Sequence, residues 1–208
     1  MIPVGGRQQA ELAEPAGWVG TAQAHELLLR LAGRLPGTLI WRLRDWLATG
    51  GQASVAAVLP RELLRRRVGL TDAERELLVE SAGAWGAKPR LLDAVLPLPA
   101  PEEAPVVFAP DPVLDTAALA ALAIVRSHPG ALELHQARRG GQRVLVVFGG
   151  DTPWLLTGTL QRLLRAHGDR TPSVEVLPTA DPSTAYHRAA VSGSAALWRS
   201  PRLATAAP

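Results

Sequence analysis

The chain has 208 residues and a formal net charge of +3 at pH 7, with 47% hydrophobic and 20% charged residues. These proportions are typical of a globular protein with a buried core, and the length suits one large domain or two small ones. Because the chain contains no cysteine, disulfides, thiolate metal sites and cysteine nucleophiles are excluded.

Arginine supplies almost all of the positive charge, since Lys88 is the only lysine among 22 cationic residues. The chain favours Ala, Arg, Gly, Pro, Leu and Val, which GC-rich codons encode, and we therefore expect a bacterial protein from a GC-rich genome. A dense basic stripe with interleaved aromatic residues, the usual sign of nucleic-acid binding, is missing. The sequence thus disfavours a nucleic-acid partner.

The chain has no apolar run close to the roughly 20 residues that a membrane-spanning helix needs. Its first residues, Met1 to Arg7, lack the apolar segment of a secretory signal. We expect a cytoplasmic protein without a membrane partner.

Residues 21–97 have apolar side chains at helical spacing, and glycine or proline interrupts them often. The pattern predicts a bundle of five or six short helices. Pro60 suits the first turn of a helix, so we expect one short segment to end before it and another helix to start there. Thr71 and Glu74 have the spacing of a capping box, which predicts a helix start at Thr71.

The boundaries follow from composition. Residues 1–20 carry no periodic pattern and are expected to form a flexible tail, as are residues 201–208. Residues 98–105, with the sequence LPAPEEAP, are proline-rich and acidic, and they predict an extended linker. The sequence therefore predicts two domains, a helical bundle and a second domain over residues 106–200.

The second domain has a different pattern of secondary structure, with the predicted order β-α-β-β-α-β and a possible α-β extension. This order predicts an α+β fold of the ferredoxin-like type or a related α/β sandwich, with one sheet and helices over one face. Gly140-Gly141 lies between two strand patterns, and a two-residue type I′ turn needs positive φ at both positions. We therefore expect a β-hairpin over residues 131–149.

The two-residue turn fixes the register of this hairpin. It pairs His135 with Val146 and Glu133 with Phe148, and period-two alternation then divides the side chains between two faces. The face expected under the helices carries Leu132, Leu134, Leu145 and Val147. The opposite face, expected to be uncovered in a ferredoxin-like sandwich, carries Glu133, His135, Ala137, Val144, Val146 and Phe148. That face fits either a partner surface, with the helical domain or a second copy covering it, or a shallow ligand site.

Gly149-Gly150 joins the second hairpin strand to a helix that begins near Thr152. Free amides at such a corner bind phosphate in some folds. However, the chain lacks both common glycine-rich phosphate motifs, and Asp151 would repel an anion. The sequence favours a structural corner, and a small-molecule or nucleotide site near residues 149–152 is the alternative.

The remaining chemistry is sparse. No histidine pair has metal-binding spacing, no serine lies in a nucleophile-elbow motif, and no cofactor or metal is expected. His25, with Glu26, is expected on the surface of the first helix. On the next helix Trp46 is expected in the core, whereas Trp41 is expected at an edge beside Arg42, a composition common at protein-contact hot spots.

These observations favour a non-enzymatic protein-interaction or regulatory protein, similar to an adaptor, with a protein partner or self-association. The alternative is a small-molecule or nucleotide-binding protein, or an enzyme, with its site near the 149–152 loop and the open sheet face. The candidate ligand or partner residues are Glu133, His135, Val146, Phe148, Asp151, Thr152, Trp41 and Arg42.

Overall fold

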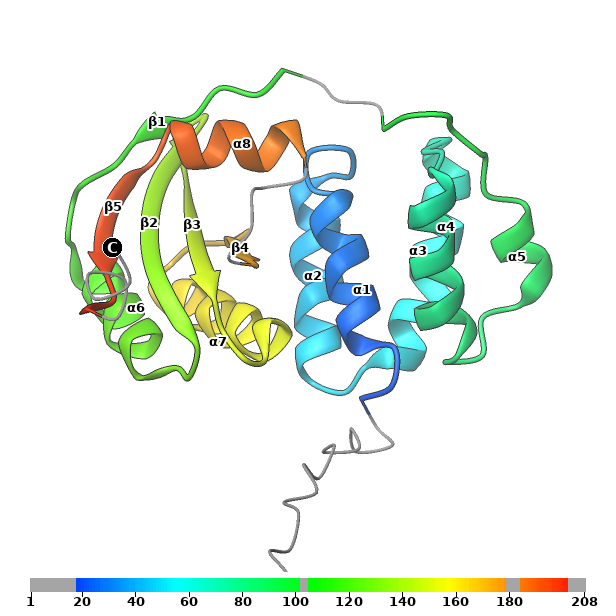
Figure 1. Ribbon diagram of the computed structural model, residues 1–208, viewed down its shortest axis with the longest axis horizontal. Coiled ribbons are helices and arrows are strands. Elements are labelled where there is room, and N and C mark those ends of the chain that lie inside the picture. Colours follow the sequence, from blue (N-terminus) through cyan, green and yellow to red (C-terminus); the bar gives the residue numbers. More distant parts are fainter. Residues whose placement is uncertain (1–17, 102–104, 179–183, 202–208) are drawn as a thin grey trace, which may run out of the picture.

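The computed structural model describes residues 18–101, 105–178 and 184–201, which form a mixed α+β structure. A helical bundle lies beside a mixed β-sheet that has helices of its own (Figure 1). Residues 1–17 of the predicted tail 1–20, and residues 202–208 of the predicted tail 201–208, lie outside the described residues. Trp18, which was assigned to the tail, instead packs against Trp154, with their ring centroids 5.9 Å apart.

The bundle consists of α1 (Thr21–Arg30), α2 (Gly37–Ala48), α3 (Gln52–Arg66), α4 (Asp72–Leu78), the π-helical turn η1 (Val79–Gly83) and α5 (Pro89–Asp93). The capping box at Thr71 is confirmed, because the Thr71 hydroxyl and the Glu74 side chain each bind the other residue's backbone amide. The break expected at Pro60 is wrong. Pro60 lies inside α3, because the apolar stripe of Val55, Leu59 and Leu63 continues through it and all three are buried.

The second half contains β1 (Ala109–Pro110), α6 (Thr116–Ser127), β2 (Ala131–Arg139), β3 (Gln142–Gly149), α7 (Pro153–Ala166), β4 (Ser173–Leu177), α8 (Ala185–Ser192) and β5 (Ala195–Arg199). The sheet has the order β1-β2-β3-β4, and β5 also pairs with β2. The β3–β4 pair is parallel and the other pairs are antiparallel. β4 is therefore the edge strand that lies nearest to the bundle (Figure 1).

The hairpin is confirmed in its register. His135 lies opposite Val146 and Glu133 opposite Phe148, and both turn glycines have positive φ, at 54° for Gly140 and 83° for Gly141. On one face of the hairpin Leu134, Leu145 and Val147 pack against α6 and α7, as the alternation predicts. A bulge between Ala131 and Glu133 shifts the alternation there, so Ala131 joins this cluster in place of the expected Leu132.

The opposite face is not open. Ala137, Val144 and Val146 are buried there under α8, together with Leu29 of α1 and with Ala32, which follows that helix. This sheet face is covered because Tyr186 and Ala190 give α8 an apolar side that must be buried. The expectation of helices over one face is therefore wrong.

The ferredoxin-like arrangement differs from this sheet in a second respect. A split β-α-β unit leaves room for a strand between the two strands that the helix connects. Here α7 connects β3 and β4, which are direct neighbours. The coarser expectation of a mixed α+β fold with a hairpin is what the structure supports.

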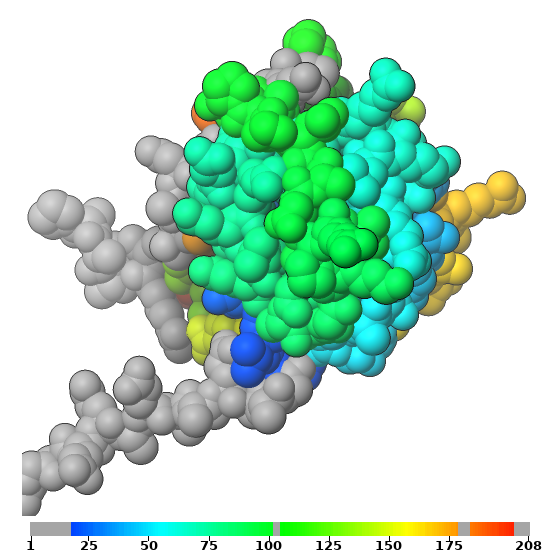
Figure 2. All heavy atoms as spheres, turned by 90° about the vertical axis from the view of Figure 1, so that its right-hand side faces the viewer, coloured from blue at the N-terminus to red at the C-terminus, as the bar shows by residue number. Residues whose placement is uncertain are grey.

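The bundle and the sheet share their apolar cores. Trp154 of α7 belongs to the core cluster of the bundle, whereas Leu29 of α1 and Ala32, just after that helix, belong to a cluster of the sheet. The outer face of the bundle, opposite the sheet, is formed by α3, α4 and α5 (Figure 2). Within the described residues, no helix has the length and apolar character needed to cross a membrane.

Candidate functional site

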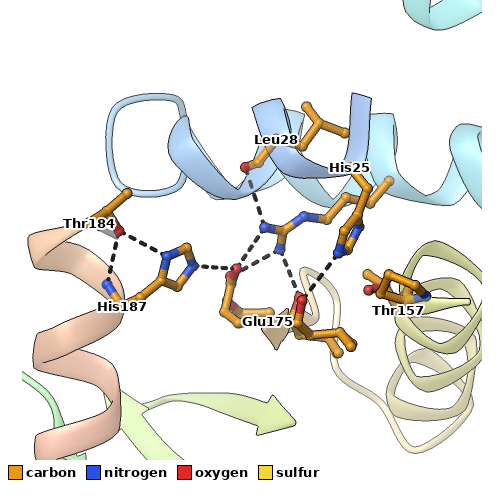
Figure 3. Close-up of polar contacts among 11 residues, drawn as sticks. His25, Leu28, Thr157, Glu175, Thr184 and His187 are labelled. Carbon is orange, nitrogen blue, oxygen red and sulfur yellow. Dashed lines mark hydrogen bonds and ion pairs between the residues drawn. The ribbon is translucent and has the colours of Figure 1, made fainter. Parts of the chain in front are cut away.

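A buried ionic cluster lies where the bundle meets β4 (Figure 3). Arg44 of α2 and Glu175 of β4 form a two-pronged ion pair: Nη1 donates to Oε1 at 3.0 Å and Nη2 donates to Oε2 at 2.6 Å. Both side chains are almost fully buried, with exposed fractions of 1% and 2%. Arg44 also donates to the backbone carbonyls of Val174 at 2.8 Å and Leu28 at 3.4 Å. The guanidinium of α2 is therefore held by two other segments of the chain, β4 and α1.

His187 of α8 extends the cluster. Its Nε2 donates to Glu175 Oε2 at 3.0 Å, and its Nδ1 lies 2.9 Å from the Thr184 hydroxyl. Thr184 is the N-cap of α8, because its hydroxyl also accepts the His187 amide at 3.2 Å. The cap fixes the start of α8 and the position of the imidazole together.

His25 of α1 binds the same strand from the other side of Arg44. Its Nε2 donates to the carbonyl of Val176 at 3.1 Å. The outward-facing carbonyls of Val174 and Val176 are thus satisfied by Arg44 and His25. A free strand edge invites pairing with another chain, and here two side chains of the bundle occupy it.

Burial and the neighbouring charges shift the pKa values of His25 and Glu175. Burial, together with the nearby Arg44 charge, lowers the pKa of His25 to about 4, so His25 is neutral at pH 7. Burial alone would raise the pKa of Glu175, but the Arg44 guanidinium and the His187 hydrogen bond outweigh it and bring this pKa to about 2. The cluster therefore contains a permanent ion pair at neutral pH.

The order hydroxyl, imidazole, carboxylate in Thr184, His187 and Glu175 is also that of a nucleophile, its base and an orienting acid. The surroundings oppose that chemistry. Glu175 is engaged by Arg44, and the crevice that reaches it has a volume of about 30 Å³, against about 300 Å³ for a small-molecule site. The arrangement is suited to joining α2, β4 and α8 rather than to turnover.

The sequence analysis missed this cluster, and it placed His25 on the surface, where the structure buries it. Two signals were available. Arg44 is a charge within the apolar stripe of α2, between Ile40 and Leu47, and Glu175 interrupts the buried strand pattern SVEVL. Neither signal identifies the partner, because the two residues are separated by 131 positions.

The predicted residues Glu133 and His135 do lie together. His135 Nε2 donates to Glu133 Oε2 at 2.7 Å, and Arg199 of β5 lies 3.2 Å from the same oxygen. His135 Nδ1 lies 3.1 Å from the Ser194 hydroxyl, which donates to the carbonyl of Val191 at 2.8 Å. The hydroxyl proton is thus already used, so this group serves to join β2, β5 and the end of α8.

The two apolar candidates, Val146 and Phe148, lie on the same sheet face as Glu133 and His135. The Phe148 ring meets His135 edge to face at a centroid distance of 5.5 Å, and Val146 is fully buried. Val146 is therefore closed to a ligand, whereas Phe148 is half-buried.

The second diglycine forms a structural corner. The amides of Gly150 and Asp151 donate to the carbonyls of Gly130 and Pro129, at 2.9 and 3.1 Å. These amides are therefore not available to a phosphate. Thr152 occupies the N-cap position of α7 but makes no side-chain capping hydrogen bond.

A hollow of about 650 Å³ lies beside this corner. Asp151, His128 and Trp198 line it, together with the C-terminal end of α6. Burial lowers the pKa of His128, and the Asp151 charge opposes this shift. Of the predicted site residues, Asp151 alone lines a ligand-sized hollow among the cavities described for these residues.

Trp41 and Arg42 lie on the solvent side of α2, where each takes part in a cation–π stack. Arg165 of α7 lies 4.6 Å from the ring centroid of Trp41, and Arg42 lies 5.3 Å from that of Trp46. Trp46, expected in the core, is only partly buried. Trp41, Arg42, Trp46, Arg162 and Arg165 together are called the α2–α7 surface.

The described residues contain no group of three or more His, Asp or Glu side chains arranged to hold a metal ion. Comparison with protein-family models gave no match, and comparisons with curated proteins and with solved structures gave none either. A functional assignment therefore rests on the geometry of these sites.

Proposed function

We propose that this chain is a non-enzymatic protein-interaction or regulatory protein that binds a protein partner through the α2–α7 surface. The two Trp–Arg stacks on that surface carry the proposal. Trp and Arg are the residues most enriched at binding hot spots. Here both are held in place by stacking before any partner arrives, which lowers the entropic cost of binding.

The position of the surface supports a regulatory role. Helix α2 carries the exposed Arg42 and the half-buried Trp41 and Trp46, and the same helix inserts Arg44 into the ionic cluster. A partner that displaces α2 would also displace Arg44 from Glu175. Binding at this surface is therefore coupled, through one rigid helix, to the contact between the bundle and the sheet.

In-cell photo-crosslinking tests the proposal. A photoreactive amino acid replaces Arg42 in one strain and Arg90 in another, since both side chains are exposed and Arg90 lies on the outer face of the bundle. We expect one defined adduct from position 42 that is absent from position 90. Adducts from neither position, or the same adducts from both, would contradict the proposal.

A small-molecule site is the second candidate, and the hollow beside Asp151 favours it. Its volume of about 650 Å³ lies in the range of about 300–1,000 Å³ for ligand pockets. Native mass spectrometry of the gently purified protein provides the test. A small additional mass that is lost on collision, and that is absent from Asp151→Asn but present in Asp169→Asn, is the expected result for this candidate.

A further inference from the structure

We infer that the partner contacts the α2–α7 surface with an acidic polypeptide segment. The inference rests on the proposed function and adds the chemistry of the partner to it. It starts from the charge of the surface, on which Arg42, Arg162 and Arg165 are all exposed.

The guanidinium groups of Arg42 and Arg165 carry unneutralised charge. Within the described part of the chain, neither has a carboxylate partner, and each lies over an indole ring. The carboxylate of Asp45 on the same helix faces Arg162 instead, at 3.5 Å. Two positive charges of the α2–α7 surface are therefore left for an external anion.

Stacking also orients these groups. A guanidinium held flat on an aromatic ring keeps its N–H edges free, and those edges match the two oxygens of a carboxylate. The surface continues toward the crevice above the ionic cluster, which Trp41 and Arg139 both line. Arg139 is itself stacked, 5.7 Å from the ring centroid of Tyr186. Repeated stacked arginines fit a row of acidic side chains.

The same stacking disfavours nucleic acid as the occupant. Proteins that bind single strands offer open aromatic faces on which bases stack. Here Trp41 and Trp46 are half-buried, and an arginine lies over each ring. A polypeptide with carboxylates satisfies the arginine edges without needing those faces.

Fluorescence anisotropy with a fluorescein-labelled oligoglutamate peptide tests the inference on the full chain. The variant Arg42→Glu/Arg165→Glu is compared with Arg61→Glu/Arg90→Glu, which makes the same change of charge at exposed arginines on the outer face of the bundle. We expect the first variant to bind about tenfold more weakly than the wild type or worse, as for the loss of hot-spot arginines. The second variant should bind almost like the wild type.

The conservative variant Arg42→Lys/Arg165→Lys keeps the charge but loses the planar edge, so we expect binding between that of the wild type and that of Arg42→Glu/Arg165→Glu. Equal loss in the two glutamate variants, absence of saturable oligoglutamate binding, or tighter binding of oligothymidylate would overturn the inference. Crosslinks at position 42 without oligoglutamate binding would refute the acidic partner alone, whereas absence of crosslinks would refute the proposed function.

Discussion

Arg44 is the residue on which the bundle–sheet contact depends most. Moving a guanidinium out of water is costly unless its hydrogen bonds and its charge are compensated. Here Glu175 provides the charge, and two backbone carbonyls accept further hydrogen bonds. The Arg44–Glu175 ion pair therefore adds little net stability. The loss of one partner, however, leaves the other charge buried without compensation.

The substitution Glu175→Gln removes the negative charge and leaves Arg44 buried without a counter-charge. We expect the free energy of unfolding, measured by urea denaturation, to fall by about 3–5 kcal/mol. The control is Glu62→Gln, because Glu62 pairs with Arg65 and Arg66 at the surface and should change stability little.

A double variant keeps this test informative if Glu175→Gln does not fold. Arg44→Met/Glu175→Met removes both charges and should be more stable than Glu175→Gln alone, because hydrophobic replacement of a whole buried pair is often tolerated. A Glu175→Gln protein as stable as the wild type would refute the structural role of the cluster.

His25 makes stability depend on pH in a window that its pKa defines. The folded pKa of about 4 lies below the unfolded value of 6.5, so the unfolded chain binds the proton more readily. The stabilisation from neutral His25 is present above pH 6.5 and is lost as the pH falls toward 4, by about 3 kcal/mol over this window.

Urea denaturation at a series of pH values measures this loss. His25→Gln should flatten the slope between pH 6.5 and 4 without abolishing it, since the pKa of His128 is also lowered by burial. An unchanged slope in His25→Gln would show that His25 does not carry the effect.

At the scale of elements, α2 and α7 make the closest helix contact between the two halves. A methyl group at Gly158 would overlap the Cβ of Ala48. This close approach positions Asp45 beside Arg162 and Trp41 beside Arg165. The α2–α7 surface thus depends on a glycine that lies beneath it.

Gly158→Ala tests this packing. Alanine favours a helix by about 1 kcal/mol over glycine, yet we expect the overlap to lower the free energy of unfolding by about 1–3 kcal/mol. Ala48→Gly in the same chain should recover much of the loss, because it removes the opposing methyl group. A Gly158→Ala protein more stable than the wild type would show that α2 and α7 can move apart to accommodate the methyl group without loss of stability.

The elements that the sequence predicted best are those specified by neighbouring residues. The Gly140-Gly141 turn fixed the hairpin register, and the spacing of Thr71 and Glu74 fixed a helix start. Pro60 was misassigned because a local rule was weighed without the core that holds α3 together. The cover over the second face of the sheet was missed for a similar reason, since it depends on where α8 packs.

At the scale of the whole molecule, the candidate sites could be predicted only where their residues are close together in the sequence. Glu133 and His135 share a strand face, and this common face followed from alternation. The ionic cluster joins α1, α2, β4 and α8, and no sequence spacing relates Arg44 to Glu175. The stacking of Arg165 on Trp41 is equally non-local, so the composition around Trp41 could not identify α7 as its neighbour.

The predicted division into two domains can be tested through the same interface. Apolar residues of each half complete the core of the other, and side chains of the bundle cover two carbonyls of β4. Separation of the halves would expose both apolar surfaces, strand the charge of Arg44 and leave a free strand edge. We therefore expect the halves to stay associated when the chain between them is cut.

A protease recognition sequence inserted in the linker, residues 98–105, provides the cut. After cleavage the two fragments should elute together in size-exclusion chromatography and separate only in urea. In the Glu175→Gln background they should separate at a lower urea concentration than in the wild type, because β4 no longer supplies the negative charge that pairs with Arg44 of the bundle. Fragments that part in buffer, with each retaining its helical circular dichroism, would mean that the linker alone connects two independent domains and that the ionic cluster adds nothing to their contact.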